Sequence, residues 1–152
     1  MSAHAVEKLW IRAAAGAAME PQDSLTLVTD QGIEGDHTYG RMRHVTLVFA
    51  DDWKAAGDEL GKDVDPAGRR ANVFVTGGNG LDYVGKTMRL GEARLVIKGE
   101  TAPCDIMEKA AEGLRDALRP DGRAGVWGRV IEGGVVRPGD VLEAIETTEA
   151  EA

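Results

Sequence analysis

The chain has 152 residues, of which 43% are hydrophobic and 29% are charged, and its formal net charge is −8. Residues 1–145 are expected to form one globular domain with a real core, and residues 146–152 an acidic, flexible tail. The negative charge disfavours a general binder of nucleic acid or of anionic membranes. No apolar run approaches the ~20 residues of a membrane span, and the N-terminus has no apolar segment of the export-signal type. With a single cysteine in addition, the chain is predicted to be cytoplasmic.

Short apolar segments separated by glycine-rich turns predict a mainly β protein. The 20 glycines suit turns and bulges better than a helical bundle. A hairpin turn is expected at Gly91-Glu92, and a second one at Glu132-Gly133-Gly134. This spacing favours a closed or nearly closed β-barrel with inserted helices. The predicted strands, in chain order, are 5–12, 25–28, 44–49, 71–75, 86–90, 93–98, 125–131, 135–136 and 141–145.

Two helices are predicted between these strands. Residues 50–60 place their apolar side chains on one face, with Asp51 or Asp52 as the N-terminal cap and Gly61 as the stop. The second helix is predicted over residues 106–118. The barrel therefore receives its helices after the third and sixth strands.

Cys104, the one cysteine, lies between a predicted strand and the second predicted helix, three residues after Thr101. A lone thiol is a buried apolar residue, a nucleophile or a soft metal ligand. Backbone N–H groups in the first turn of a helix stabilise negative charge, including a thiolate. A metal ligand of this kind suits molybdenum, copper(I) or zinc, whereas a nucleophile needs a base such as His37 or His44. The residues alone leave these roles open.

The loop at 31–41 is dense in polar and ionisable side chains and includes Gly35, Asp36 and His37. Glycines let its backbone adopt special angles, and loops often carry binding groups. An ordinary surface loop is the competing interpretation. A zinc site that combines this loop with His44 and Cys104 is disfavoured, because the spacing matches no standard zinc signature.

Two arginines and an amide, Arg69, Arg70 and Asn72, enter a predicted strand together. Arginine binds phosphate and carboxylate groups in a bidentate manner, so this segment suits an oxyanion. Solvated surface arginines are the alternative.

Taken in order, seven such segments resemble the MOSC domain, named after the C-terminal domain of molybdenum cofactor sulfurases. The resemblance covers about residues 6–145 and has one cysteine in the expected place. The matching segments are Gly32 to His37, Arg43 to Leu47, Arg69 to Val73, Leu90 to Ala93, Pro103 to Glu108, Gly125 to Val130 and Gly133 to Asp140.

The resemblance implies a barrel related to a β-barrel domain of pyruvate kinase. It also implies the molybdenum cofactor (molybdopterin), with the Cys104 thiolate as the molybdenum ligand. The pterin and its phosphate are then expected to lie against basic and polar residues at the strand ends. His37 or His44 is expected to pass a proton. The implied cofactor contacts are Gly35, Asp36, Arg69, Arg70, Asn72 and Thr101.

Relatives of this size reduce small N-hydroxylated compounds with electrons from a separate reductase, and this activity is the main expectation here. A non-catalytic carrier or sulfur-transfer module is one alternative, and a cofactor-free anion-binding barrel is another. A cysteine hydrolase or transferase is a weaker one. Pyridoxal phosphate belongs to a separate domain of the larger sulfurases, and neither that domain nor an iron–sulfur cysteine cluster is expected here.

Overall fold

The computed structural model describes residues 3–145, so the acidic tail predicted at 146–152 lies outside the described residues. Seven strands form a closed barrel, because the first and last strands of the series pair with each other. All neighbours in the barrel are antiparallel except β5 and β6, which run parallel. The barrel prediction is thereby confirmed. Around the barrel the order is β11 (Val141–Ala144), β7 (Thr87–Leu90), β8 (Ala93–Glu100), β9 (Val126–Glu132), β5 (Val45–Phe49), β6 (Val73–Val75) and β1 (His4–Ile11).

Four shorter strands complete the sheet structure. β2 (Glu20–Pro21) extends the pairing of β1, while β10 (Gly134–Val136), β3 (Leu25–Val28) and β4 (Gly32–Ile33) form a separate small sheet. The second hairpin predicted from the sequence is therefore wrong, because β10 pairs with β3 and not with β9. Gly133 and Gly134 make this crossing feasible. A Cβ atom on Gly133 would lie 2.6 Å from the Leu27 carbonyl oxygen.

Two clusters of buried side chains divide the core. One fills the barrel and includes Val45, Leu47 and Phe49 of β5. The other lies outside the barrel and includes Val48 and Trp53. β5 thus alternates between the two clusters, as a strand that is covered on both faces should. Thr46 lies two residues before Val48 and therefore on the same outer face of β5. This face thus carries a polar residue next to the outer core.

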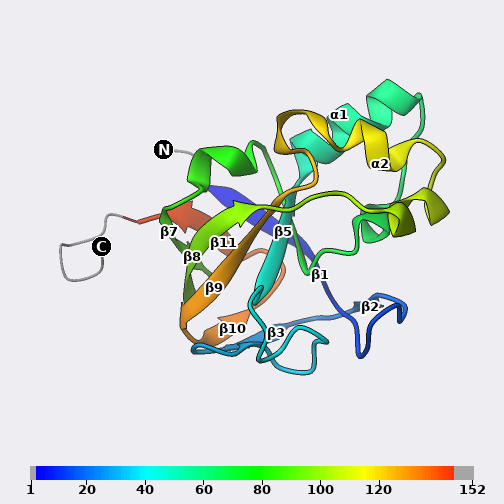
Figure 1. Ribbon diagram of the computed structural model, residues 1–152. Coiled ribbons are helices and arrows are strands. Elements are labelled where there is room, and N and C mark those ends of the chain that lie inside the picture. The colour runs from blue at the N-terminus through cyan, green and yellow to red at the C-terminus, as the bar shows by residue number, and fades with distance from the viewer. Residues whose placement is uncertain (1–2, 146–152) are drawn as a thin grey trace.

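Two α-helices cover this outer face, α1 (Ala50–Leu60) and α2 (Leu114–Ala117). Figure 1 shows both helices at one end of β5, with β3 and β10 toward the other end. The first helix has the predicted bounds and ends at Gly61 in the left-handed conformation. Its N-cap is Phe49, whose side chain makes no capping hydrogen bond, so the expected cap at Asp51 or Asp52 is wrong. No helix in the described part of the chain is both long and apolar enough to cross a membrane.

The second predicted helix, 106–118, is wrong in its central part. The segment consists of the 3-10 helix η3 (Asp105–Lys109) and, after a turn, α2. Gly113 breaks the helix because its φ of 87° lies in the left-handed region. A Cβ atom there would also lie 3.0 Å from Leu60 of α1. The Glu108 carboxylate joins the two pieces by accepting hydrogen bonds from the backbone N–H groups of Gly113 (3.0 Å) and Arg115 (2.8 Å). Three further 3-10 helices are η1 (Pro66–Arg69), η2 (Gly80–Tyr83) and η4 (Pro120–Gly122).

Gly125, which directly precedes β9, is a testable constraint on the barrel. Its φ is +99°, and an added Cβ atom would lie 2.1 Å from the Leu47 carbonyl oxygen of the neighbouring strand. We expect Gly125→Ala to lower the free energy of unfolding by about 3 kcal/mol or more, since strain and backbone overlap act together. Gly139→Ala is the matched control, with a φ of +91° and no atom within 4 Å. Urea denaturation measures both, and equal losses would show that the overlap at Gly125 is relieved.

Asp52 in the first turn of α1 gives stability a pH dependence. Burial raises the pKa of its carboxyl from 3.8 to about 6, against the opposing effect of a hydrogen bond from the Gly80 backbone. The folded chain therefore retains a proton that the unfolded chain releases, so stability falls as pH rises from about 4 to about 6. We expect Asp52→Asn to raise the melting temperature at pH 7 and to lose this advantage near pH 4. The exposed neighbour Asp51, changed to Asn, is the control, and a pH-independent gain at Asp52 would contradict the assignment.

Candidate functional site

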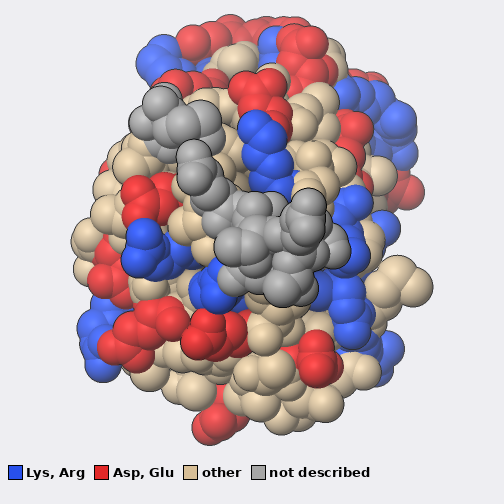
Figure 2. Space-filling view, turned by 90° about the vertical axis from the view of Figure 1, so that its left-hand side faces the viewer, with Lys and Arg blue, Asp and Glu red and all other residues tan. Residues whose placement is uncertain are grey.

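A cavity of about 210 Å³ brings together side chains from five separate segments of the chain. Four of its lining residues are arginines, and none carries a carboxylate. This is unusual in a chain with a net charge of −8. Figure 2 shows another face, on which acidic and basic side chains are interspersed. The cavity is therefore a local concentration of positive charge, lined by Arg12, Thr38, Arg43, Thr46, Arg69, Arg70, Thr101, Ala102, Cys104, Ile106 and Met107.

Arg69 is the buried cation of the site, with only 5% of its surface exposed. Its Nε donates a hydrogen bond to the Ala124 carbonyl, and its Nη2 donates to Thr101 Oγ1 at 2.6 Å. Both acceptors are neutral, and no carboxylate of the described residues forms an ion pair with it. Burial, together with the neighbouring charges of Arg12 and Arg43, lowers the pKa of Arg69 to about 10, against the opposing effect of Cys104. The guanidinium thus stays charged at neutral pH without an anionic partner.

Thr101 fixes Arg69 in place. Its hydroxyl accepts from Arg69 and donates to the Ala124 carbonyl at 2.8 Å, while its backbone N–H donates to Gly125 at 3.0 Å. A hydroxyl that is used as both acceptor and donor has a defined orientation. The residues at the end of β8 and the start of β9 therefore hold the Arg69 guanidinium in one orientation.

Arg70 adopts a backbone conformation that is rare for a residue with a side chain. Its φ is 64°, and its backbone N–H donates to the Ala67 carbonyl to close η1. The side chain donates to the Ala17 carbonyl, but its buried Nε has no partner among the described residues. Burial lowers the pKa of Arg70, and Arg12 contributes in the same direction. Strain of this kind is often found at binding sites, where it directs a side chain.

Asp36 and Asn72 lie behind the cavity wall and organise it. The buried Asp36 carboxylate accepts hydrogen bonds from the backbone N–H of Arg12 (3.0 Å) and from the Thr38 hydroxyl (2.6 Å). The Asn72 amide donates to Asp36 and to the Trp10 carbonyl, both at 3.3 Å, and its oxygen accepts from the Thr46 backbone N–H at 3.0 Å. The negative charge of Asp36 is therefore stabilised by hydrogen bonds inside the protein, and the carboxylate does not face the cavity as a lining group. Asp36 and Asn72 position the lining residues Arg12, Thr38 and Thr46.

Arg43, which also lines the cavity, lies over the ring of Trp127. Its guanidinium carbon lies 5.4 Å from the ring centroid, within the range of a cation–π interaction. Trp127 itself packs against Gly99, where an added Cβ atom would lie 3.1 Å from its Nε1. A glycine in β8 thus makes room for the ring that supports an arginine of the site.

Cys104 is exposed, which excludes the buried structural cysteine considered from the sequence. It is the N-cap residue of η3, a five-residue 3-10 helix, so the longer helix expected to support a thiolate is absent from this position. Among residues 3–145, no three His, Cys, Asp or Glu side chains form a metal-binding group. Of the residues that line this cavity, Cys104 offers a thiol and Met107 a thioether as soft donor groups.

The structure places the predicted site residues in three groups. Arg69, Arg70, Thr101 and Cys104 line the cavity, and Asp36 and Asn72 support it. Gly35, His37 and His44 are not among the lining residues. Gly35 has a φ of 86°, which allows the turn that precedes Asp36, and the His37 backbone N–H donates to the Arg12 carbonyl at 2.7 Å.

His44 is fully buried at the start of β5. Its Nδ1 accepts a hydrogen bond from the Val130 backbone N–H at 2.9 Å, so the neutral ring carries its proton on Nε2, which has no partner among the described residues. Burial lowers the pKa of His44, and Arg129 adds to this effect. The ring is therefore neutral at physiological pH and links β5 to β9.

Four polar lining residues were not identified from the sequence as site residues, namely Arg12, Thr38, Arg43 and Thr46. Arg12 and Thr38 approach the cavity only because Asp36 draws their backbone together. Thr46 could have been found from the alternation along β5, since it is the polar residue on the face that bears Val48.

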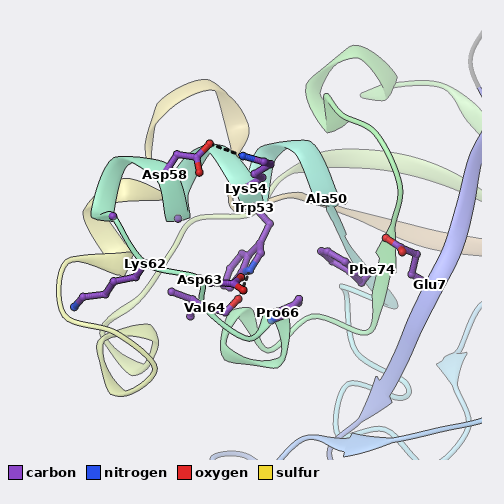
Figure 3. Close-up of a pocket in the computed structure, with 12 residues that line it drawn as sticks. Glu7, Ala50, Trp53, Lys54, Asp58, Lys62, Asp63, Val64, Pro66 and Phe74 are labelled. Atoms are coloured by element: carbon purple, nitrogen blue, oxygen red, sulfur yellow. Dashed lines mark hydrogen bonds and ion pairs between the residues drawn. The ribbon is translucent and has the colours of Figure 1, made fainter.

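A larger cavity, of about 680 Å³, lies elsewhere in the structure. Figure 3 shows it between α1, the segment that follows α1, and the strand residues Glu7 and Phe74. Trp53 lies in it and donates from Nε1 to the Val64 carbonyl at 2.7 Å, and Lys54 and Asp58 on its rim form an ion pair at 2.9 Å. Its rim charges have both signs, and it contains none of the candidate residues. The smaller cavity is therefore the better candidate for a functional site.

The fold of this chain is shared with several solved bacterial proteins. The YuaD protein from Bacillus subtilis is 20% identical, with a TM-score of 0.81 over 97% of this chain and 98% of that one. YiiM from Escherichia coli is 21% identical, with a TM-score of 0.72 over 97% of this chain and 72% of that one. YiiM from Geobacillus stearothermophilus is 16% identical, with a TM-score of 0.75 over 94% and 75%.

No protein of curated function has a significant sequence match to the chain. The sequence pattern of the MOSC domain, in contrast, matches residues 34–143, which include both the cavity cysteine and Arg69 and Arg70. The family resemblance found in the sequence is thus confirmed, and with it the barrel. The chain belongs to the MOSC domain family.

Proposed function

We propose that this protein binds the molybdenum cofactor in the cavity lined by four arginines, with the Cys104 thiolate as the molybdenum ligand. The observation that carries the proposal is that an exposed thiol and a buried guanidinium without a carboxylate partner line the same cavity. The cofactor combines an oxyanion, a polar pterin and a soft metal, and these residue types match its chemistry.

The four arginines differ in burial and therefore in how they would contact the cofactor. Arg69 is rigid and desolvated, so an anion next to it gains more than it would at an exposed cation. Arg12, Arg43 and Arg70 are more accessible and suit the outer oxygens of a phosphate. The Thr38 and Thr46 hydroxyls supply neutral hydrogen bonds to polar edges of the ligand.

The activity we propose is the reduction of small N-hydroxylated compounds. When bound, the cofactor supplies a redox centre that exchanges two electrons. The balanced change is R–NHOH plus two electrons and two protons, which gives R–NH₂ and water as the N–O bond breaks. A separate reductase supplies the electrons. The protein supplies binding, orientation and a positively charged environment around the reacting group.

His37 and His44 were expected to pass a proton, but neither lines the cavity. His44 is neutral and engaged through Nδ1. We therefore assign it to holding β5 and β9 together, and we propose that water in the open cavity delivers the protons.

Molybdenum content tests the ligand. We expect protein purified from a host that makes the cofactor to contain close to one molybdenum per chain, measured by plasma mass spectrometry. Cys104→Ala and the near-isosteric Cys104→Ser should both fall to below about a tenth of that content, because neither retains a soft thiolate. Both variants should fold, since Cys104 is exposed. Wild-type protein without molybdenum, or variants with equal metal, would contradict the proposal.

Arg69 offers a second test that needs no cofactor. Phosphate should raise the melting temperature of the wild type at constant ionic strength, because the anion compensates the buried charge. We expect Arg69→Met to abolish this rise while leaving the anion-free protein as stable or more stable, since Thr101 still donates to Ala124. The exposed Arg119, changed to Met, is the control. A phosphate effect that survives in Arg69→Met would show that the anion binds elsewhere.

A further inference from the structure

The cavity of about 680 Å³ beside α1, shown in Figure 3, takes no part in the function proposed above. Its lining comes from β1, α1, the segment 61–66 and β6, and it shares no lining residue with the arginine-lined cavity. Its volume lies in the range of roughly 300–1,000 Å³ that is typical of pockets for small molecules. The chemistry of its lining therefore decides which class of ligand it suits.

Two mostly buried aromatic side chains, Trp53 and Phe74, form the apolar part of the lining together with Ala50, Val64 and Pro66. Both rings also belong to the outer core cluster, so they are packed in place on one side. The Trp53 indole N–H donates to the Val64 carbonyl at 2.7 Å, which fixes the orientation of this ring (Figure 3). Aromatic side chains attract both apolar groups and cations. This wall of the cavity therefore suits the apolar body of a positively charged ligand.

A β-bulge in β1 places Glu7 at this cavity. The residues on either side of it, Val6 and Lys8, pair with consecutive residues of β6, so Glu7 is an extra residue without a partner there. Glu7 and Lys8 are both exposed, although successive side chains normally alternate between the two faces of a strand. Bulges of this kind often redirect a side chain beside a binding site. Figure 3 shows the result, with the Glu7 carboxylate next to Phe74.

The charges around the cavity favour a cation over an anion. Within residues 3–145, the carboxylates of Glu7 and Asp63 form no hydrogen bond or ion pair, whereas Asp58 is paired with Lys54 at 2.9 Å. Lys62 is the remaining cation of the lining, and Figure 3 shows its side chain directed away from Trp53 and Phe74. An anion in the cavity would therefore meet carboxylates without partners, and a cation would be attracted by them.

We propose that this cavity binds a small organic cation with an apolar body, such as an aryl-substituted ammonium ion. The apolar body contacts Trp53 and Phe74, and the ammonium group lies against the Glu7 carboxylate. A bare metal ion is a poorer fit, since no three His, Cys, Asp or Glu side chains of the described chain form a metal-binding group. The inference goes beyond the proposed function, because none of the four arginines of the other cavity lies here.

An NMR titration of the indole N–H signals tests the inference, because Trp53 reports from the wall of the cavity. The chain has three tryptophans, and Trp53→Phe identifies which signal belongs to Trp53. At constant ionic strength, we expect benzyltrimethylammonium to shift this signal and to bind at least about fivefold more tightly than benzyl alcohol, which lacks the charge. Glu7→Gln should reduce this preference to less than about twofold and leave the affinity for benzyl alcohol unchanged. Glu20→Gln is the matched control and should keep the preference, since Glu20 is an exposed strand residue outside the cavity.

A preference for the cation that Glu7→Gln removes and Glu20→Gln retains supports the inference. An equal loss in both variants would show that the net charge of −8 attracts the cation without a defined site, and this overturns it. A titration that leaves the Trp53 signal unchanged, equal affinity for the two probes, or no binding of either probe also overturns it. None of these outcomes bears on the arginine-lined cavity, because neither probe carries an oxyanion.

Discussion

The buried guanidinium of Arg69 is the constraint on which the rest of this site depends. A desolvated cation is costly unless it is paired, yet its two hydrogen-bond acceptors, Ala124 and Thr101, are neutral. The fold nevertheless tolerates the desolvation free energy of Arg69, and the result is a rigid positive charge at the cavity. An anion bound beside Arg69, as we propose, would offset this cost and so couple folding stability to ligand binding.

The barrel explains why these residues meet although they are far apart in the chain. β5 and β6 are parallel neighbours, so the segments that lead into them, with Arg43 and Asn72, lie at the same end of the sheet. β8 and β9 are paired up to Glu100 and Val126, which brings Thr101 next to Gly125. The end of β1 adds Arg12. The cavity therefore forms beside five neighbouring strands, β8, β9, β5, β6 and β1, and most of its polar residues come from the segments that adjoin them.

Strand positions and the barrel could be predicted from the sequence because apolar alternation and glycine-rich turns are local signals. The second helix could not, because the break at Gly113 reflects the close approach of Leu60, a contact across the fold. The hairpin at Glu132 failed for the same kind of reason, since β10 pairs with a strand more than a hundred positions earlier. The local sequence pattern therefore identified the strands and helices better than it identified which strands pair with each other.

The candidate site shows the same division. Cys104, Arg69 and Arg70 could be found because a single thiol and an arginine pair stand out in an acidic chain. The supporting role of Asp36 could not be found, because an aspartate that accepts several internal hydrogen bonds looks in sequence like one that faces a ligand. Arg12 was overlooked for a related reason. Nothing marks it locally, and only the hydrogen bond from its backbone to Asp36 brings it to the cavity.

The charge distribution links the whole molecule to the site. With a net charge of −8, the protein as a whole repels anions, and the field of four arginines is confined to a small concave region. An anion bound as we propose would therefore be held by short-range contacts with Arg69 and its neighbours, and not collected by a broad positive surface. This favours a ligand whose shape matches the cavity over anions in general. It also means that neutral parts of the ligand must contribute to affinity.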